Sequence, residues 1–149
     1  MKPVRTLVLV AGEENARLLI NDGIGKGLTE RAGLSVAQFA DAQVEYEDRP
    51  GRQTGGPGGT ARHGFDTHEH DQEIARSNFA QHVVEAVQET WARVKPDRLI
   101  VAAPPKMLGA LRAKLSGAPA AALHGDLAKD LVKVPVHDLP PHFADIQPM

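Results

Sequence analysis

Residues 99–115 read LIVAAPPKMLGALRAKL, and this stretch decides the fold. Its first half is a short continuous apolar run, which is typical of a β-strand buried on both faces of a sheet. Pro104 and Pro105 then start a helix, because proline fits the first helical turn, where its missing N–H has no intrahelical partner. The predicted helix ends at Gly117. Three leucines share one face of it: Leu108, Leu111 and Leu115.

The apolar run VRTLVLVA at residues 4–11 predicts a second central strand, which we expect to lie parallel to the strand at 99–104. A turn, AGEEN, follows, and ARLLIND at 16–22 predicts the return strand of a hairpin. The glycine-rich GIGKG at 23–27 indicates another turn. We expect the rest of residues 23–47 to complete a meander.

Residues 49–72 show no hydrophobic periodicity, so we predict a long Gly-rich loop there; segments of this kind are usually functional or disordered. From Asp71, a plausible N-cap, to Pro96, the expected stop, the sequence predicts the longest helix. Phe79 and Trp91 should anchor it in the core. Its apolar residues recur at helical spacing: Ile74, Phe79, Val83, Val84, Val87, Trp91 and Val94.

The remaining segments predict a last strand and turn at 120–131 and a short helix or turn at 136–143. This order of elements indicates the α/β class, with a mixed β-sheet flanked by helices in three layers. The 149 residues match the usual size of one domain, and 42% of them are hydrophobic, enough for one core. We therefore predict a single domain over residues 1–149.

Composition narrows the classes of function. The net charge of −2 argues against nucleic-acid affinity by bulk charge, so any such affinity must come from a local patch. The absence of cysteine excludes disulfides and thiol catalysis. The apolar runs are too short to span a bilayer, and the first residues read as a buried strand rather than a signal peptide. We expect a cytoplasmic protein with no membrane partner.

No catalytic constellation stands out. GIGKG lacks the spacing of a phosphate-binding loop, and Ser35, Ser77 and Ser116 lie outside any nucleophile elbow. Glu13 and Glu14 look like solvated turn residues. Lys106 follows the 99–104 strand, but the two prolines before it remove donors that an anion site would use. We therefore predict no catalytic residue and no cofactor.

The segment HGFDTHEHD at 63–71 carries three histidines among carboxylates. Imidazole and carboxylate bind zinc or nickel, so His63, His68 and His70 are weak candidates for a metal site. His68 and His70 lack the i, i+4 spacing of a helical zinc site, and we favour a solvated, helix-capping acidic segment.

A locally basic stretch includes GRQTGGPGG at 51–59. Between Arg49 and Phe65 the ionised side chains are three arginines, with no acid. Arginines on a flexible loop can contact a phosphate backbone. The alternative, that the arginines only keep the loop soluble, is equally supported by the sequence. The candidate nucleic-acid-binding residues are Arg49, Arg52, Gly55, Gly56, Gly58, Gly59, Arg62 and His63.

LIVAAPPKMLGALRAKLS followed by DLAKDLVKV resembles the paired signature of the host attachment protein family ("protein required for attachment to host cells"). VLVAGEENARLL at 8–19 and RPGR at 49–52 fit the N-terminal half of that family. The family is similar to the middle domain of archaeal and eukaryotic class I release factors and to its bacterial relatives. This resemblance implies a mixed sheet flanked by helices.

In those release factors a Gly-Gly-Gln tip precedes the long helix and enters the peptidyl-transferase centre. Gly55 and Gly56 match the two glycines, but Pro57 stands where the resemblance implies glutamine, and Gln53 precedes the glycines. Proline has neither a side-chain amide to position water nor a backbone N–H to stabilise a transition state. The resemblance therefore implies the scaffold without the release chemistry.

Three hypotheses follow. The first is a non-catalytic cytoplasmic protein that binds RNA, tRNA or the ribosome through the basic Gly-rich loop. The second is a hydrolase acting on peptidyl-tRNA or RNA, with a metal at the histidines. The third is a factor that is required, indirectly, for attachment to host cells.

Overall fold

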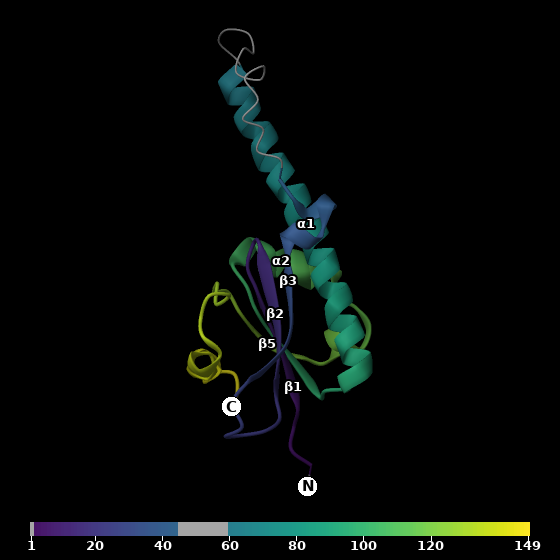
Figure 1. Ribbon diagram of the computed structural model, residues 1–149, viewed down its shortest axis with the longest axis vertical. Coiled ribbons are helices and arrows are strands. Elements are labelled where there is room, and N and C mark those ends of the chain that lie inside the picture. The colour runs from purple at the N-terminus through teal and green to yellow at the C-terminus, as the bar shows by residue number, and fades with distance from the viewer. Residues whose placement is uncertain (1, 45–59) are drawn as a thin grey trace.

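The computed structural model describes residues 2–44 and 60–149, and for residues 60–66 the backbone alone. These residues form an open sheet in the order β3-β2-β1-β4-β5 (Figure 1). β1 is parallel to β4, and β4 to β5, whereas β2 is antiparallel to both β1 and β3. The predicted mixed α/β sheet is confirmed. The strands are β1 (Thr6–Ala11), β2 (Asn15–Asn21), β3 (Thr29–Ser35), β4 (Arg98–Ala102) and β5 (Leu123–Leu127).

Helices cover one face of the sheet, and the chain after β5 covers the other (Figure 1). The α-helices are α1 (Thr60–Val94), α2 (Pro105–Lys114) and α3 (Gly117–Ala121). The 3-10 helices are η1 (Val36–Gln38), η2 (Ala40–Ala42), η4 (Val136–Asp138) and η5 (Pro140–Phe143). The last two confirm the short helical structure expected at 136–143.

Strand β1 separates two hydrophobic cores. Leu7 and Leu9 face α1 and α2, while Val8 and Val10 face the C-terminal segment, and all four are fully buried. Successive side chains of a strand point to opposite faces, so a strand that is covered on both sides needs apolar residues at every position. This is why the run at residues 4–11 shows no alternation.

The C-terminal segment, residues 131–149, is fastened to the sheet by polar contacts as well as by its own core. Buried Gln147 donates from Nε2 to Oγ1 of Thr6 on β1, at 3.0 Å. Arg17 on β2 donates from Nη1 to the carbonyl oxygens of Val132 and Val134, at 3.0 and 2.6 Å. These bonds tie the second layer to two strands near the start of the chain.

The start of α1 corrects the sequence analysis. The helix begins at Thr60, so residues 60–72 are helical rather than part of a loop, and Asp71 lies inside the helix rather than at its N-cap. Ile74, expected on the core face, is 47% exposed. Among the described residues, the part of α1 before residue 75 packs against no core. Its sequence therefore has no need of apolar residues at helical spacing, and none was visible.

Other expectations have mixed outcomes. The GIGKG turn is confirmed, with positive φ at Gly23, Gly25 and Gly27, and β3 confirms the third strand of the meander. The prediction that Gly117 ends the second helix is wrong: α2 ends at Lys114, and Gly117 begins α3. The N–H of the C-cap residue, Leu115, donates to the Leu111 carbonyl, so α2 closes without a glycine.

Candidate functional site

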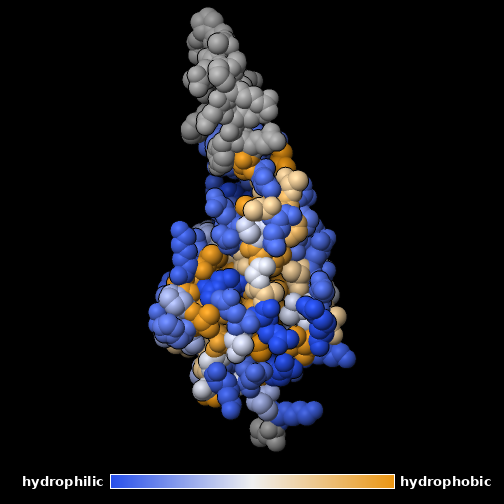
Figure 2. All heavy atoms as spheres, in the orientation of Figure 1, coloured by the Kyte–Doolittle hydropathy of each residue, from blue (hydrophilic) through white to orange (hydrophobic). Residues whose placement is uncertain are grey.

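Helix α1 has a packed half and a projecting half. Among its described side chains, burial begins at Ala75 and continues through fully buried Phe79 and Val83 to Thr90. Residues 60–74, which we call the arm, extend past the end of the sheet (Figure 1). At 1.5 Å per residue the arm is about 22 Å long. On the face shown in Figure 2, hydrophobic residues are exposed near the grey region, where α1 leaves the body.

The described side chains of the arm are mainly polar and acidic. Glu69, Asp71 and Glu73 are exposed to solvent, and His70 is exposed beside them. Such a surface repels phosphate, so a contact with nucleic acid would have to avoid this stretch.

Two of the predicted nucleic-acid-binding residues lie at the start of α1, and the other six lie outside the described residues. Arg62 and His63 lie in the first turn of α1, where only the backbone is described. The other members of the set lie outside the described residues: Arg49, Arg52, Gly55, Gly56, Gly58 and Gly59. The basic segment, residues 49–63, thus runs in the sequence into the first turn of α1.

The three candidate metal ligands do not form a described site. His68 is half-buried, and its Nε2 lies 3.2 Å from Nε2 of Gln72 one turn along α1. His70 is exposed, and two residues of separation place it about 200° around the helix from His68. Within residues 2–44 and 67–149 no group of three metal-binding side chains is present, and the His63 side chain lies outside them.

A crevice lies beside the base of the arm, between the turn that follows β1 and helix α2, which follows β4. The chain leaving β1 turns towards β2, while the chain leaving β4 crosses to β5 on the other side. In open α/β sheets, ligands bind outside the carboxyl ends of the strands where the connections diverge in this way. This topology makes the crevice the candidate functional site.

An ion pair stands in the middle of the crevice. Nε of Arg76, on α1, lies 2.9 Å from each carboxylate oxygen of Glu13, on the β1–β2 turn. The Arg76 side chain is only 14% exposed, and that of Glu13 is 45% exposed. Glu13 is therefore more than the solvated turn residue that the sequence suggested, because it holds the base of the arm to β1.

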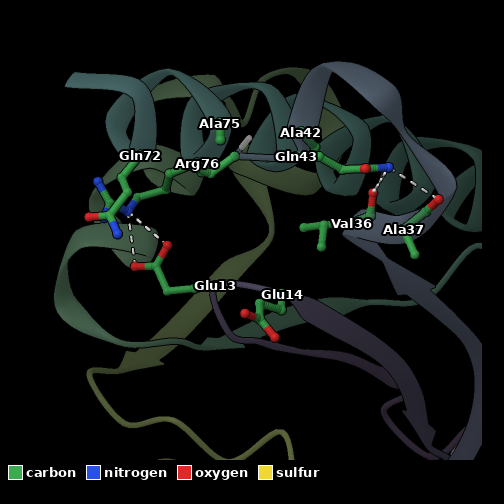
Figure 3. A pocket seen from close by; sticks show the side chains of 10 residues that line it. Glu13, Glu14, Val36, Ala37, Ala42, Gln43, Gln72, Ala75 and Arg76 are labelled. Atoms are coloured by element: carbon green, nitrogen blue, oxygen red, sulfur yellow. Dashed lines mark hydrogen bonds and ion pairs between the residues drawn. The ribbon is translucent and has the colours of Figure 1, made fainter. Parts of the chain in front are cut away.

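A cavity of about 390 Å³ lies on one side of this ion pair. Figure 3 shows Gln72 and Arg76 on one side of it, Gln43 and Val36 on the other, and the β1–β2 turn below. Ala42 and Ala75 are buried and complete an apolar wall. The cavity combines an apolar lining with a few polar groups, as small-molecule sites do.

A second cavity of about 590 Å³ lies between α1 and the start of α2. Gln72 and Arg76 line both cavities, and Ser77 and Lys106 line the second. Lys106, which the sequence placed near a doubtful anion site, therefore faces the same crevice from α2.

The segment η1–η2 forms one wall of the first cavity and is docked on α1. Phe39 stacks on His82 with ring centroids 3.9 Å apart and an interplanar angle of 11°. Nε2 of His82 lies 2.8 Å from Oδ1 of Asp41, and Nδ2 of Asn78 donates to the Asp41 carbonyl oxygen at 2.7 Å. These contacts fix the wall that carries Val36 and Gln43.

Sequence reasoning missed the crevice. Glu13 and Arg76 are 63 positions apart, and nothing local to either indicates the other. One available signal was the pair of acids directly after the first buried strand, a place where α/β sheets carry functional side chains.

Comparison with known families identifies this chain. Residues 7–143 match the model of the family described as "Protein required for attachment to host cells". The match covers both halves of the sheet, α1 and the C-terminal segment as far as η5. The chain belongs to this family.

The host attachment family member shows no match among curated protein sequences. In the described part of the chain, no helix is both long and apolar enough to cross a membrane.

Proposed function

We propose that this host attachment family member is a non-catalytic binding protein that contacts RNA, tRNA or the ribosome through its basic segment, residues 49–63. The arm carries the proposal. Helix α1 begins 15 residues before Ala75, the first buried residue among its described side chains, and the basic segment adjoins the outer end of the helix in the sequence. A projecting helix of this kind can carry a contact surface away from an acidic body.

The charge pattern supports contact at the end of the arm rather than along it. Three arginines and no acid occur between Arg49 and Phe65, whereas the described part of the arm exposes three carboxylates. Guanidinium groups bind phosphate with paired hydrogen bonds, and carboxylates oppose it. The proposed contact is therefore short and strongly dependent on salt.

A binding role also fits the sequence of the segment. The predicted likeness to the release-factor middle domain places Gly55 and Gly56 at a catalytic tip, but Pro57 lacks the amide groups which that chemistry uses. We therefore propose binding without cleavage, in the cytoplasm. The role in attachment that the family's description names would then be indirect.

The test is co-sedimentation with ribosomes on a sucrose gradient at low salt. The triple variant Arg49→Gln, Arg52→Gln, Arg62→Gln should lose the association and flatten its salt dependence. The matched control, Arg31→Gln, Arg93→Gln, Lys133→Gln, removes the same charge from exposed positions of the body and should still associate.

Absence of the wild-type protein from every ribosomal fraction at low salt would contradict the proposal, as would equal losses in the two variants. Cell fractionation tests the indirect role in attachment. Native protein found outside the cell would favour direct action at the surface instead.

A further inference from the structure

Three large hydrophobic residues are exposed among the described residues, and two of them share one cavity. Ile24, in the turn after β2, is 78% exposed, and Val4, before β1, is 41% exposed. Both line a cavity of about 470 Å³, which we call the Ile24 cavity, and Pro3 and Pro148 line it too. Exposed apolar residues that gather in one place indicate a contact surface, whereas scattered ones do not.

The turn that presents Ile24 is held in one conformation. Asn21, which is 1% exposed, donates from Nδ2 to the carbonyl oxygens of Gly23 and Gly27, at 3.0 and 2.7 Å. A Cβ on Gly23 would lie 3.1 Å from Cβ of Pro3, so the turn packs closely against the segment before β1. An apolar group that is fixed before binding loses little entropy when a partner covers it.

Cations flank the Ile24 cavity. Lys2 and Arg98 line it, and Lys26 stands two positions after Ile24 in the same turn. Within the described residues, neither lysine side chain has a hydrogen bond or an ion pair. Complementary charge favours an acidic partner surface here.

The carboxylates next to this cavity in the sequence do not cancel its charge. Asp22 and Asp97 both contact Arg5: Oδ1 of Asp22 lies 3.2 Å from Nε, and Oδ2 of Asp97 accepts from the backbone N–H at 2.9 Å. With Arg5 counted, four cations stand against two carboxylates. Two copies that met through this same patch would therefore repel each other.

The third exposed hydrophobic residue, Ile74, lies among acids in the arm. It is 47% exposed, and Asp71, three positions earlier on the same face of α1, and Glu73 are exposed beside it. Figure 1 shows the arm at one end of the molecule and both termini, with the turn after β2, at the other. This acidic, apolar face complements the Ile24 cavity, but the two cannot meet within one copy.

We propose that copies of this chain associate head to tail, with the Ile74 face of one arm bound at the Ile24 cavity of the next copy. Ile74 contacts the apolar lining, and the carboxylates of the arm approach the cations beside it. Because the two surfaces differ, each contact leaves one of each kind free, and the assembly can grow. This contact goes beyond the proposed RNA or ribosome binding and uses no residue of the basic segment.

Sedimentation equilibrium of the full chain tests the contact. One apolar anchor and a few ion pairs make a weak interface, so we expect a dissociation constant of about 100 µM and an average mass above that of a dimer at about 1 mM. Ile24→Gln and Ile74→Gln each remove one side of the apolar contact and should each weaken the association at least tenfold. Both residues are exposed, so both variants should fold normally.

An equal mixture of these two variants is the decisive sample. It retains one intact contact, between the arm of the Ile24→Gln chain and the cavity of the Ile74→Gln chain. The mixture should therefore form dimers with the dissociation constant of the wild type, with little further growth. A contact between two identical surfaces would not be rescued in this way.

A pair of double variants tests the charges. Asp71→Asn, Glu73→Gln should weaken the association about threefold or more, because it removes the carboxylates that face the cations. The matched control, Glu85→Gln, Glu89→Gln, removes the same charge from side chains that are 58% and 73% exposed on the packed half of α1. It should associate like the wild type.

Four results would overturn the proposal. They are a wild-type chain that is monomeric at about 1 mM, a wild-type mass that stops at two chains, a mixture of the two isoleucine variants that associates no better than either alone, and equal effects of the two double charge variants. None of these bears on the ribosome association, so the two proposals fail separately.

Discussion

The two halves of α1 share one backbone conformation but not one cause of stability. From Ala75 to Thr90 the helix buries a face against β1, β4 and α2, and its buried positions recur at helical spacing. Across the arm, residues 60–74, the hydrogen-bonded helix continues, but its described side chains are exposed or half-buried. Packing accounts for the first half, whereas helical hydrogen bonds and continuity with the packed turns account for the second.

The largest effect should come from truncating the packed half. Phe79→Ala removes a fully buried ring and should lower the free energy of unfolding by about 3–5 kcal/mol. Ile74→Ala truncates a residue that is 47% exposed and should change the free energy of unfolding by no more than about 0.5 kcal/mol. Urea denaturation of both variants measures the difference, and similar losses would show that the arm is buried in solution.

A pair of proline substitutions separates backbone from packing. Gln81 and Asp71 are both exposed positions within α1, so proline at either removes one helical hydrogen bond and little side-chain contact. Gln81→Pro should cost about 3 kcal/mol of global stability, because it distorts a segment that the core holds. Asp71→Pro should lower helix content, measured by circular dichroism, with little change in the urea midpoint. A large midpoint shift for Asp71→Pro would mean that the arm and the body unfold as one unit.

The smallest effect concerns the ion pair at the boundary of the two halves. A double-mutant cycle with Glu13→Gln and Arg76→Gln should give a coupling energy of about 1 kcal/mol. This is the upper end of the range for surface pairs, because the Arg76 side chain is largely buried while Glu13 is partly exposed. A coupling near zero would mean that other contacts of α1 hold the base of the arm to β1.

Much of the sheet could be predicted because its signals are local. The runs at 7–11 and 99–104 are apolar at every position, which is typical of a strand covered on both faces, and GIGKG marks its turn by glycines that adopt positive φ. The start of α1 could not be predicted from hydrophobic periodicity. Apolar residues recur at helical spacing only where a helix packs against a core, and the described part of the arm does not. The misplaced N-cap at Asp71 marks where periodicity begins rather than where the helix begins.

The crevice could not be predicted, because its residues meet only through the fold. Glu14, Gln43 and Arg76 come from three segments, and each alone resembles an ordinary polar surface residue. The basic segment, in contrast, was evident from composition alone. What composition cannot supply is its position, and the 49–59 part lies outside the described residues.

The double coverage of β1 also has a consequence in time. The chain is made from its N-terminus, and Thr6 and Gln147, which bond across the second core, are 141 positions apart. Until residues 131–149 emerge, Val8 and Val10 have helices behind them but nothing over them. A nascent chain therefore exposes these apolar side chains through most of its synthesis. Only when the C-terminal segment packs over them is this face of the sheet protected from aggregation.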